Sequence, residues 1–327
     1  TCFCFSSYLA RSPQTPFRPH FELLAEMNGN VDDHYTITNE VLGSGFFATV
    51  KVGINKKTGE KVAVKIIDKS KVEESPQLLQ NEIDIMAKVN HPHVVGLRAV
   101  FDTPATLFIV MELVQGGELY ELIVERKTFS EKDTSHIMGQ VFSALEYLHE
   151  IGIVHRDLKL ENMLLNDKKA LSVKVADFGL SKLYSGQALQ TACGTPFYVA
   201  PDILLGTGYG PEVDMWACGV LLYILLSGRL PFHADNDAQL FQLIMEGNLV
   251  FKSPQFDTVS SDATDLIRKL LVVDPKTRLT ATQALQHPFI KGADAQSTKA
   301  LHPTLVENIT RVSMVSRRQL DRKKFTD

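Results

Sequence analysis

The sequence predicts an α+β protein with two lobes, a small antiparallel β-sheet lobe with one main helix and a larger lobe that is mainly helical. Three observations support this fold class. Residues 35–68 alternate apolar and polar side chains around turn signals, as antiparallel strands do. Residues 76–89 carry apolar side chains at helical spacing. After Gly116 and Gly117, helical patterns dominate to about residue 290.

The predicted small lobe spans residues 35–113. Turn signals that contain glycine and asparagine divide residues 35–68 into three strands. Apolar residues such as Ile83 and Met86 form one face of the helix that is predicted next. Residues 91–113 then predict two further strands, which gives the lobe five strands and one helix.

The predicted large lobe spans residues 114–290 and lies between an N-terminal tail (1–34) and a basic C-terminal tail (291–327). Ser130 is a suitable N-cap for the helix that begins there. Residues 214–228 are apolar on nearly all sides, so this helix should be buried. The hinge between the two halves is where ligand sites often lie.

Composition excludes several classes of partner. The chain has 327 residues, of which 44% are hydrophobic and 22% charged, as in an ordinary globular protein. Its net charge of −4 favours neither nucleic acid nor an anionic membrane as the main partner. Its 4 cysteines fit neither a disulfide framework nor a zinc site, so we expect a reduced, intracellular setting in the cytoplasm, the nucleus or both. Neither a transmembrane helix nor a signal peptide is predicted.

A glycine-containing loop joins the first two predicted strands. It consists of Leu42, Gly43, Ser44, Gly45, Phe46, Phe47, Ala48, Thr49 and Val50. Glycines without side chains let backbone N–H groups approach phosphates closely. Ala48 stands where a full G-x-G-x-x-G pattern has its third glycine, so a plain hairpin turn is the alternative for this motif alone.

Lys65 ends the strand Val62–Lys65 and carries an ammonium that can hold phosphate groups. A carboxylate on a facing helix would fix this lysine, and Glu82 on the predicted helix is the candidate. The alternative is an ordinary surface lysine and a solvated glutamate.

The segment His155–Asn162 reads HRDLKLEN and is the most specific motif. Asp157 could accept the proton of a substrate hydroxyl, and Lys159 could stabilise a phosphoryl group in transfer. Asn162, and Asp177 in the sequence DFG, offer the hard oxygen ligands that Mg²⁺ prefers.

Five motifs in order resemble the eukaryotic protein kinases over about residues 35–290. They are the glycine-rich loop, VAVK ending at Lys65, HRDLKLEN, DFG and APD at 200–202. The resemblance implies the bilobal protein kinase fold and transfer of the γ-phosphoryl group of ATP to protein hydroxyls. It implies Mg²⁺ as the metal, with Mn²⁺ as a substitute.

The resemblance also implies a role for each candidate residue. Asp157 is the expected catalytic base, Lys65 and Glu82 form the activating ion pair, and Asn162 and Asp177 hold the metal ions. The adenine pocket is expected to comprise the gatekeeper Met111, the hinge from Glu112 to Val114, and the apolar residues Leu42, Val50, Ala63 and Leu164. Asp214 is expected to brace the catalytic loop from the buried helix.

Finer features resemble the Ser/Thr kinases, and within them the calcium/calmodulin-dependent kinase group, with calmodulin-dependent and checkpoint-kinase-2-like enzymes as the nearest types. Lys159 and Thr195 match the Ser/Thr form, in which Thr195 bonds Asp157 and Lys159. Glu118 and Glu161 resemble the carboxylates that bind an arginine three residues before the target, which implies R-x-x-S/T substrates. A solvated Glu118 is the alternative.

Regulation is expected at two places. Arg156 in HRD is expected to bind an anion, typically a phosphothreonine. Thr191 matches the phosphorylation site of the activation loop, and its phosphorylation would require an upstream kinase. Cys193 beside it is either a redox switch or an inert thiol. The tail from residue 291 holds eight Lys/Arg against four Asp/Glu. It is expected to restrain the cleft or bind calmodulin, with a solvated, disordered tail as the alternative.

Two departures and two rival functions complete the expectations. Ala48 departs from the glycine pattern, and Asp202 replaces the usual glutamate that pairs with an arginine resembling Arg278. We expect this shorter pair to be strained or bridged by water. A pseudokinase scaffold would need a missing catalytic residue, and the sequence lacks none. A small-molecule kinase would not need the peptide platform at 195–202.

Overall fold

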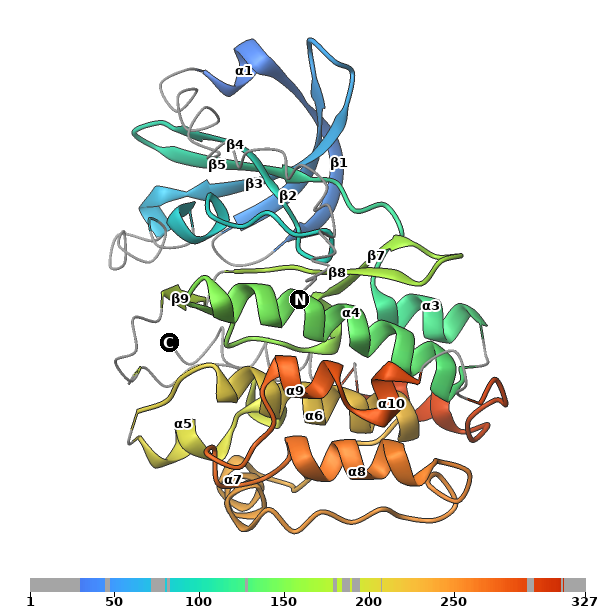
Figure 1. The fold of residues 1–327 in the computed structure, drawn as a ribbon. Coiled ribbons are helices and arrows are strands. Elements are labelled where there is room, and N and C mark those ends of the chain that lie inside the picture. Colours follow the sequence, from blue (N-terminus) through green and yellow to red (C-terminus); the bar gives the residue numbers. More distant parts are fainter. Residues whose placement is uncertain are drawn as a thin grey trace, which may run out of the picture.

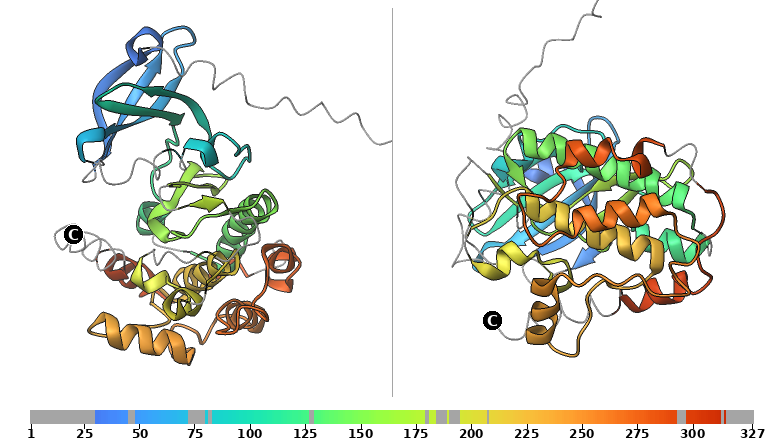
Figure 2. Two further views of the ribbon diagram at one scale, coloured as in Figure 1. Left: turned by 90° about the vertical axis from the view of Figure 1, so that its left-hand side faces the viewer. Right: turned by 60° about the horizontal axis from the view of Figure 1, so that its bottom comes forward.

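The computed structural model shows a chain folded into two lobes, one above the other in Figure 1. The structure describes residues 30–44, 48–71, 80, 83–126, 129–178, 181–183, 189, 195–206, 208–292, 297–312 and 314. One lobe holds an antiparallel sheet and the other most of the helices, so the predicted α+β fold class with two lobes is confirmed. The left view of Figure 2 shows the strands of the small lobe gathered at one end of the molecule.

The small lobe is built on a five-stranded antiparallel sheet with the order β1-β2-β3-β5-β4. Its elements are α1 (Val31–His34), β1 (Tyr35–Ser44), β2 (Ala48–Asn55), β3 (Lys61–Asp68), the 3₁₀ turn η3 (Lys69–Lys71), β4 (Leu97–Asp102) and β5 (Thr106–Glu112). All five predicted strands are present. Of the predicted helix at 76–89 the structure describes residue 80 and residues 83–89, of which 80 and 83–86 are helical.

Strand β3 of the small lobe carries buried apolar side chains on both faces of the sheet. On one face Val62 and Val64 of β3 pack with Tyr35 and Phe101. On the other face Ile67 joins the main core, which continues through the helical turn into the large lobe. Lys65 lies between these positions on β3, the central strand of the sheet, and lines a cleft that residues of the large lobe also line.

The large lobe is mainly helical. Its helices are α3 (Leu119–Arg126), α4 (Glu131–Glu150), α5 (Pro201–Leu205), α6 (Glu212–Ser227), α7 (Asp237–Glu246), α8 (Ser261–Leu270), α9 (Ala281–Leu285) and α10 (Pro288–Lys291), with the 3₁₀ turns η4 (Leu160–Asn162) and η5 (Pro196–Tyr198). Its short strands are β6 (Ile153–Val154), β7 (Met163–Asp167), β8 (Ser172–Val175) and β9 (Lys182–Leu183).

Helix α6 is the centre of the large lobe, as its apolar sequence predicts. From Val213 to Ser227 every residue of it is buried. A helix that is apolar on all sides must be covered by neighbouring elements, and α4 and α8 both pack on α6. Within the described part of the chain, no helix combines the length and apolar character that a membrane span requires.

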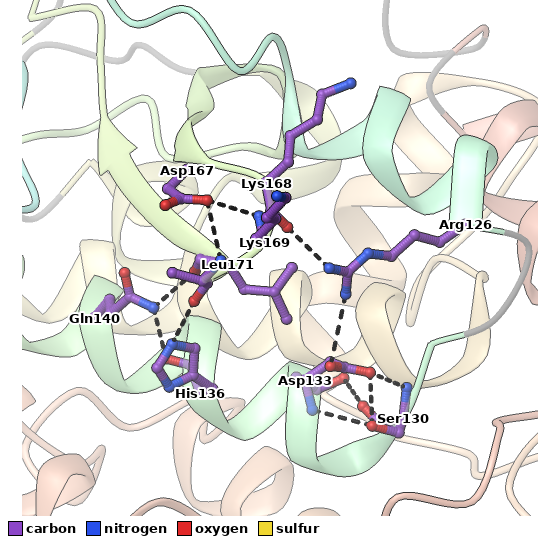
Figure 3. A network of polar contacts seen from close by, with 11 residues as sticks. Arg126, Ser130, Asp133, His136, Gln140, Asp167, Lys168, Lys169 and Leu171 are labelled. Carbon is purple, nitrogen blue, oxygen red and sulfur yellow. Dashed lines mark hydrogen bonds and ion pairs between the residues drawn. The ribbon is translucent and has the colours of Figure 1, made fainter.

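A polar network fixes the β7–β8 hairpin to the start of α4 (Figure 3). Ser130 and Asp133 form a reciprocal capping box, so the predicted N-cap is confirmed. Arg126 donates to the carbonyl oxygen of Lys168 at 2.8 Å, and Gln140 donates to that of Leu171 at 2.9 Å. The hairpin connects Asn162 to Asp177 along the chain, so these contacts help to place both candidate metal ligands.

Residues 297–312 pack against the large lobe beyond the predicted boundary at residue 290. The segment 305–312 is helical, and Leu301, Leu305 and Ile309 are buried. Gly228, at the end of α6, has φ +70°, and a Cβ there would lie 2.6 Å from the Leu305 carbonyl oxygen. Only glycine therefore allows this close approach between α6 and the C-terminal helix.

Candidate active site

A cleft of about 570 Å³ lies between the two lobes. Residues of both lobes line it, namely Leu42, Gly43, Ser44, Ala48, Val50, Ala63, Lys65, Met86, Val95, Met111, Glu112, Leu113, Val114, Gly117, Glu118, Glu121, Glu161, Asn162, Leu164, Ala176, Asp177 and Phe178. Nearly every residue expected to bind the nucleotide is among them. Gly45, Phe46 and Phe47 lie outside the described residues.

The apolar end of the cleft is a slot between the sheet and the β7–β8 hairpin. Ala63 is in register with Met111, so the strand above the slot and the strand that enters the hinge are aligned. Leu164 on β7 lies on the side of the large lobe, where β7 pairs with β8. A flat aromatic ring suits a slot with apolar side chains on both sides and backbone polar groups of the hinge at its end.

The hinge is anchored to the large lobe by backbone hydrogen bonds. Gly116 donates to the Leu165 carbonyl oxygen, and Leu165 donates to the Gly117 carbonyl oxygen, each at 2.8 Å. A Cβ on Gly116 would lie only 2.2 Å from the Leu165 oxygen, so the two backbones meet at a distance that only glycine allows. The two glycines that signalled a break in the sequence therefore form a tight junction.

Lys65 lines the polar end of the cleft. On β3 it is in register with Val50 of β2 and Ile109 of β5, and it is half-buried. Glu82 lies outside the described residues, so its ion pair with Lys65 stays a prediction.

Asp157, Lys159 and Thr195 form a buried triangle in the large lobe. Lys159 Nζ donates to Asp157 Oδ2 at 2.5 Å, and Thr195 Oγ1 donates to Asp157 Oδ1 at 3.1 Å. Lys159 Nζ also lies 3.3 Å from Thr195 Oγ1. Each carboxylate oxygen thus has a donor, and the three side chains expected to act together are brought together.

Two oxygen-bearing side chains stand on the floor of the cleft beside this triangle. The Asn162 amide nitrogen donates to the Asp157 carbonyl oxygen at 2.8 Å, which leaves the Asn162 side-chain oxygen as an acceptor. Asp177 is exposed on the cleft wall with φ +65°. An amide oxygen and a carboxylate fit Mg²⁺, which takes few protein ligands and completes its shell with phosphate oxygens and water. Among the described residues no group of three or more His, Cys, Asp or Glu offers another metal site.

Comparisons with known proteins agree with this geometry. A family model described as "Protein kinase domain" matches residues 36–290. Myosin light chain kinase A of Dictyostelium discoideum is 49% identical over 263 residues, which cover 79% of this chain and 89% of that protein. The chain belongs to the serine/threonine protein kinases. Calcium/calmodulin-dependent protein kinase type 1B of Rattus norvegicus is 45% identical over 274 residues, 83% of this kinase and 79% of that protein. Calcium/calmodulin-dependent protein kinase type 1 of Macrobrachium nipponense is 42% identical over 281 residues, which cover 85% of this chain and 81% of that protein. A protein kinase domain implies ATP as a substrate, and the inter-lobe cleft is the candidate site for it.

Asp214 on α6 binds the backbone of the segment His155–Asp157, the expected catalytic loop. Asp214 accepts hydrogen bonds from the backbone N–H groups of His155 at 2.9 Å and Arg156 at 2.8 Å. Its carboxylate also lies 2.8 Å from His149 Nε2. Burial by itself raises the pKa of Asp214, but the hydrogen bond and charge of His149 and the donors from the loop outweigh it, and the pKa lies below its usual value.

This lowered pKa predicts a stability that depends on pH. The stabilisation by Asp214 is complete above about pH 4, the usual pKa of an unfolded aspartate, and is lost as pH falls through the lower folded pKa. We expect Asp214→Asn to lower stability by about 2 kcal/mol at neutral pH, because a charged acceptor is lost. The decrease of Tm between about pH 5 and 3 should become less steep. Calorimetry with exposed Asp235→Asn as the control tests this, and an unchanged slope would contradict it.

The sequence did not single out Met86, Val95, Ala176 or Glu121 as lining residues, and they also line the inter-lobe cleft. Met86 and Val95 come from the helical turn and the loop before β4. Their apolar character was visible, but nothing in the residue types separated them from ordinary core residues. Phe178 is buried and packs edge-on against His155, with ring centroids 5.0 Å apart, so it links the DFG segment to the catalytic loop.

The shorter pair at Asp202 is in direct contact. Arg278 Nη1 lies 2.8 Å from Asp202 Oδ2, and both residues are buried. Of the two expected alternatives, strain or a water bridge, this direct contact contradicts the water bridge, and Asp202 Oδ2 has no hydrogen bond of regular geometry. Arg278 further donates to the carbonyl oxygens of Glu212 at 2.8 Å and Val272 at 3.0 Å. The pair joins α5 to the segment between α8 and α9, and Arg278 also contacts Glu212 at the start of α6.

Proposed function

We propose that the kinase transfers the γ-phosphoryl group of ATP to Ser or Thr in R-x-x-S/T contexts. The observation that carries this proposal is the buried triangle of Asp157, Lys159 and Thr195, which lies beside a cleft that ends at two oxygen ligands. In this arrangement Asp157 orients the substrate hydroxyl and accepts its proton, and Lys159 neutralises charge on the phosphoryl group.

The remaining groups of the site complete the proposal. Asn162 and Asp177 are the ligands for Mg²⁺, or for Mn²⁺ in its place, and this metal supplies charge neutralisation at the phosphates when bound. Lys65 positions the phosphates and is fixed by Glu82. The catalytic residues that a pseudokinase scaffold would lack are all present in the sequence, so catalysis is the better interpretation.

Arginine selection is proposed to depend on Glu118 and Glu161. Both line the inter-lobe cleft, Glu118 next to its bridge to Leu164 and Glu161 in η4, where its carboxylate oxygens are buried. Two carboxylates that line the same cleft suit the planar, charged fork of an arginine side chain. A substrate arginine three residues before the target is the corresponding proposal.

Regulation is proposed to act through Thr191 and the C-terminal tail. Phosphorylation of Thr191 by an upstream kinase would place an anion near Arg156. The curated relatives include calcium/calmodulin-dependent kinases, which supports calmodulin as a partner of the basic tail. Thr191 and residues 315–327 lie outside the described residues, whereas the helix at 305–312 packs on the large lobe.

A peptide assay tests this function. We expect transfer of labelled phosphate to R-x-x-S peptides, with kcat/KM about tenfold lower for peptides that have alanine at the arginine position. The double variant Glu118→Gln/Glu161→Gln should show no such difference.

The tail is tested on chains 1–327 and 1–314 with and without Ca²⁺/calmodulin. The shorter chain keeps the packed helix and removes only the basic end. Equal rates on both peptides would refute the arginine preference, and absence of transfer would favour the scaffold.

A further inference from the structure

Arg156, the residue before Asp157, is held at both its backbone and its side chain. Its backbone N–H donates to Asp214 Oδ1 at 2.8 Å, and its Nη1 donates to the hydroxyl oxygen of Tyr209 at 2.9 Å. Its φ of +70° lies in the left-handed region that residues other than glycine rarely adopt. Such a conformation persists only where the surroundings fix it, so these contacts bear on the shape of the catalytic loop.

Tyr209 is itself rigidly placed, between α5 and α6. Its side chain is buried, with 4% of the residue exposed. Its backbone N–H donates to the Leu189 carbonyl oxygen at 2.9 Å, and the Leu189 N–H donates back at 2.8 Å. The adjacent Gly210 N–H donates to Glu212 at the start of α6. Tyr209 therefore connects the catalytic loop, the segment that leads to Thr195, and α6.

We infer that Tyr209 is a positioning residue for phosphoryl transfer. Its hydroxyl oxygen orients the Arg156 side chain and thereby the backbone that presents Asp157, while its own backbone ties Leu189 to the same point. This inference rests on the proposed role of Asp157. Tyr209 lines no part of the ATP cleft and acts through Arg156. A hydrogen bond from a charged guanidinium is stronger than one between neutral groups, so one hydroxyl can have a measurable effect.

The alternative is that the Tyr209 ring only fills the core. Tyr209→Phe separates the two, because phenylalanine keeps the ring and the backbone pairing with Leu189 and removes only the hydroxyl. Tyr223→Phe is the matched control. Tyr223 is equally buried at 3% exposed, and its hydroxyl donates to the Val250 carbonyl oxygen at 2.8 Å. It lies nine residues along α6 from Asp214, about 13 Å along the helix axis.

The experiment measures kcat, the KM for ATP and Tm for the full chain and both variants, with an R-x-x-S peptide as substrate. We expect Tyr209→Phe to lower kcat about tenfold with a KM for ATP within twofold of the wild type. Tyr223→Phe should retain the wild-type kcat, and the two variants should show similar small shifts in Tm. An unchanged kcat in Tyr209→Phe would overturn the inference, as would a parallel loss of kcat and Tm in both variants.

A double-mutant cycle tests whether Tyr209 acts through Arg156. In an Arg156→Gln background, which already lacks the guanidinium, Tyr209→Phe should cause no further loss of kcat. A further tenfold loss in that background would show that the hydroxyl acts elsewhere and would overturn the inference. Failure of the proposed function has a different signature, because the wild type would then transfer no phosphate or Asp157→Asn would keep its rate.

Discussion

Asp157→Asn is expected to lower kcat by at least about 10³-fold, the upper part of the range for loss of a general base. The substituted side chain has the same shape and can keep the triangle, since its amide oxygen can face Lys159 while Thr195 turns its hydroxyl to accept from the amide nitrogen. What is lost is the capacity to accept the proton. Tm and the KM for ATP should therefore change little.

Steady-state kinetics and calorimetry on the purified full chain check this result. Asp262→Asn is a suitable control, because Asp262 is an exposed acid in the first turn of α8. It should retain the wild-type kcat. Retention of more than about a tenth of the activity by Asp157→Asn would mean that Asp157 is not the base. A large drop in Tm would mean that the triangle is mainly structural.

The elements that the sequence predicted best are those whose signal is local. Alternating apolar and polar side chains between turn residues indicated three strands in residues 35–68, and each of these signals lies within a single strand. The apolar run of α6 and the cap at Ser130 are local in the same sense. The candidate catalytic residues could be proposed from the sequence because phosphoryl transfer requires fixed residue types at short spacings, as in the segment from His155 to Asn162.

The contacts that the sequence did not predict join distant segments through ordinary residue types. Tyr209 bonds Arg156 across more than 50 positions, and nothing in a tyrosine between two glycines indicates this partner. The C-terminal helix is a similar case. Leu301, Leu305 and Ile309 have helical spacing, but their basic surroundings favoured a tail, and the surface that buries them includes Gly228 in a remote part of the chain.

Asp202→Asn is expected to destabilise the kinase by about 3 kcal/mol, the lower end of the cost of breaking a buried ion pair. Asp202 Oδ2 lies 2.8 Å from Arg278 Nη1 without the angles of a hydrogen bond, whereas Arg278 bonds backbone carbonyl oxygens and stacks 5.2 Å from the Trp216 ring. Asp202 thus contributes chiefly its charge. Burial lowers the pKa of Arg278, and the charge of Asp202 partly offsets this.

An isosteric change that removes only the charge leaves the guanidinium buried without its counter-ion. Denaturant unfolding should show the loss, and Tm should fall by about 5–10 °C. Asp202→Glu restores the charge with one more methylene and should cost less than about 1.5 kcal/mol. Glu125→Gln breaks an exposed pair with Lys168 and should leave the free energy of unfolding close to that of the wild type. If Asp202→Asn were as mild as this control, the carbonyl oxygens and the Trp216 ring alone would stabilise the Arg278 charge. The charge of Asp202 would then contribute little to the stability of the contact between α5 and Arg278.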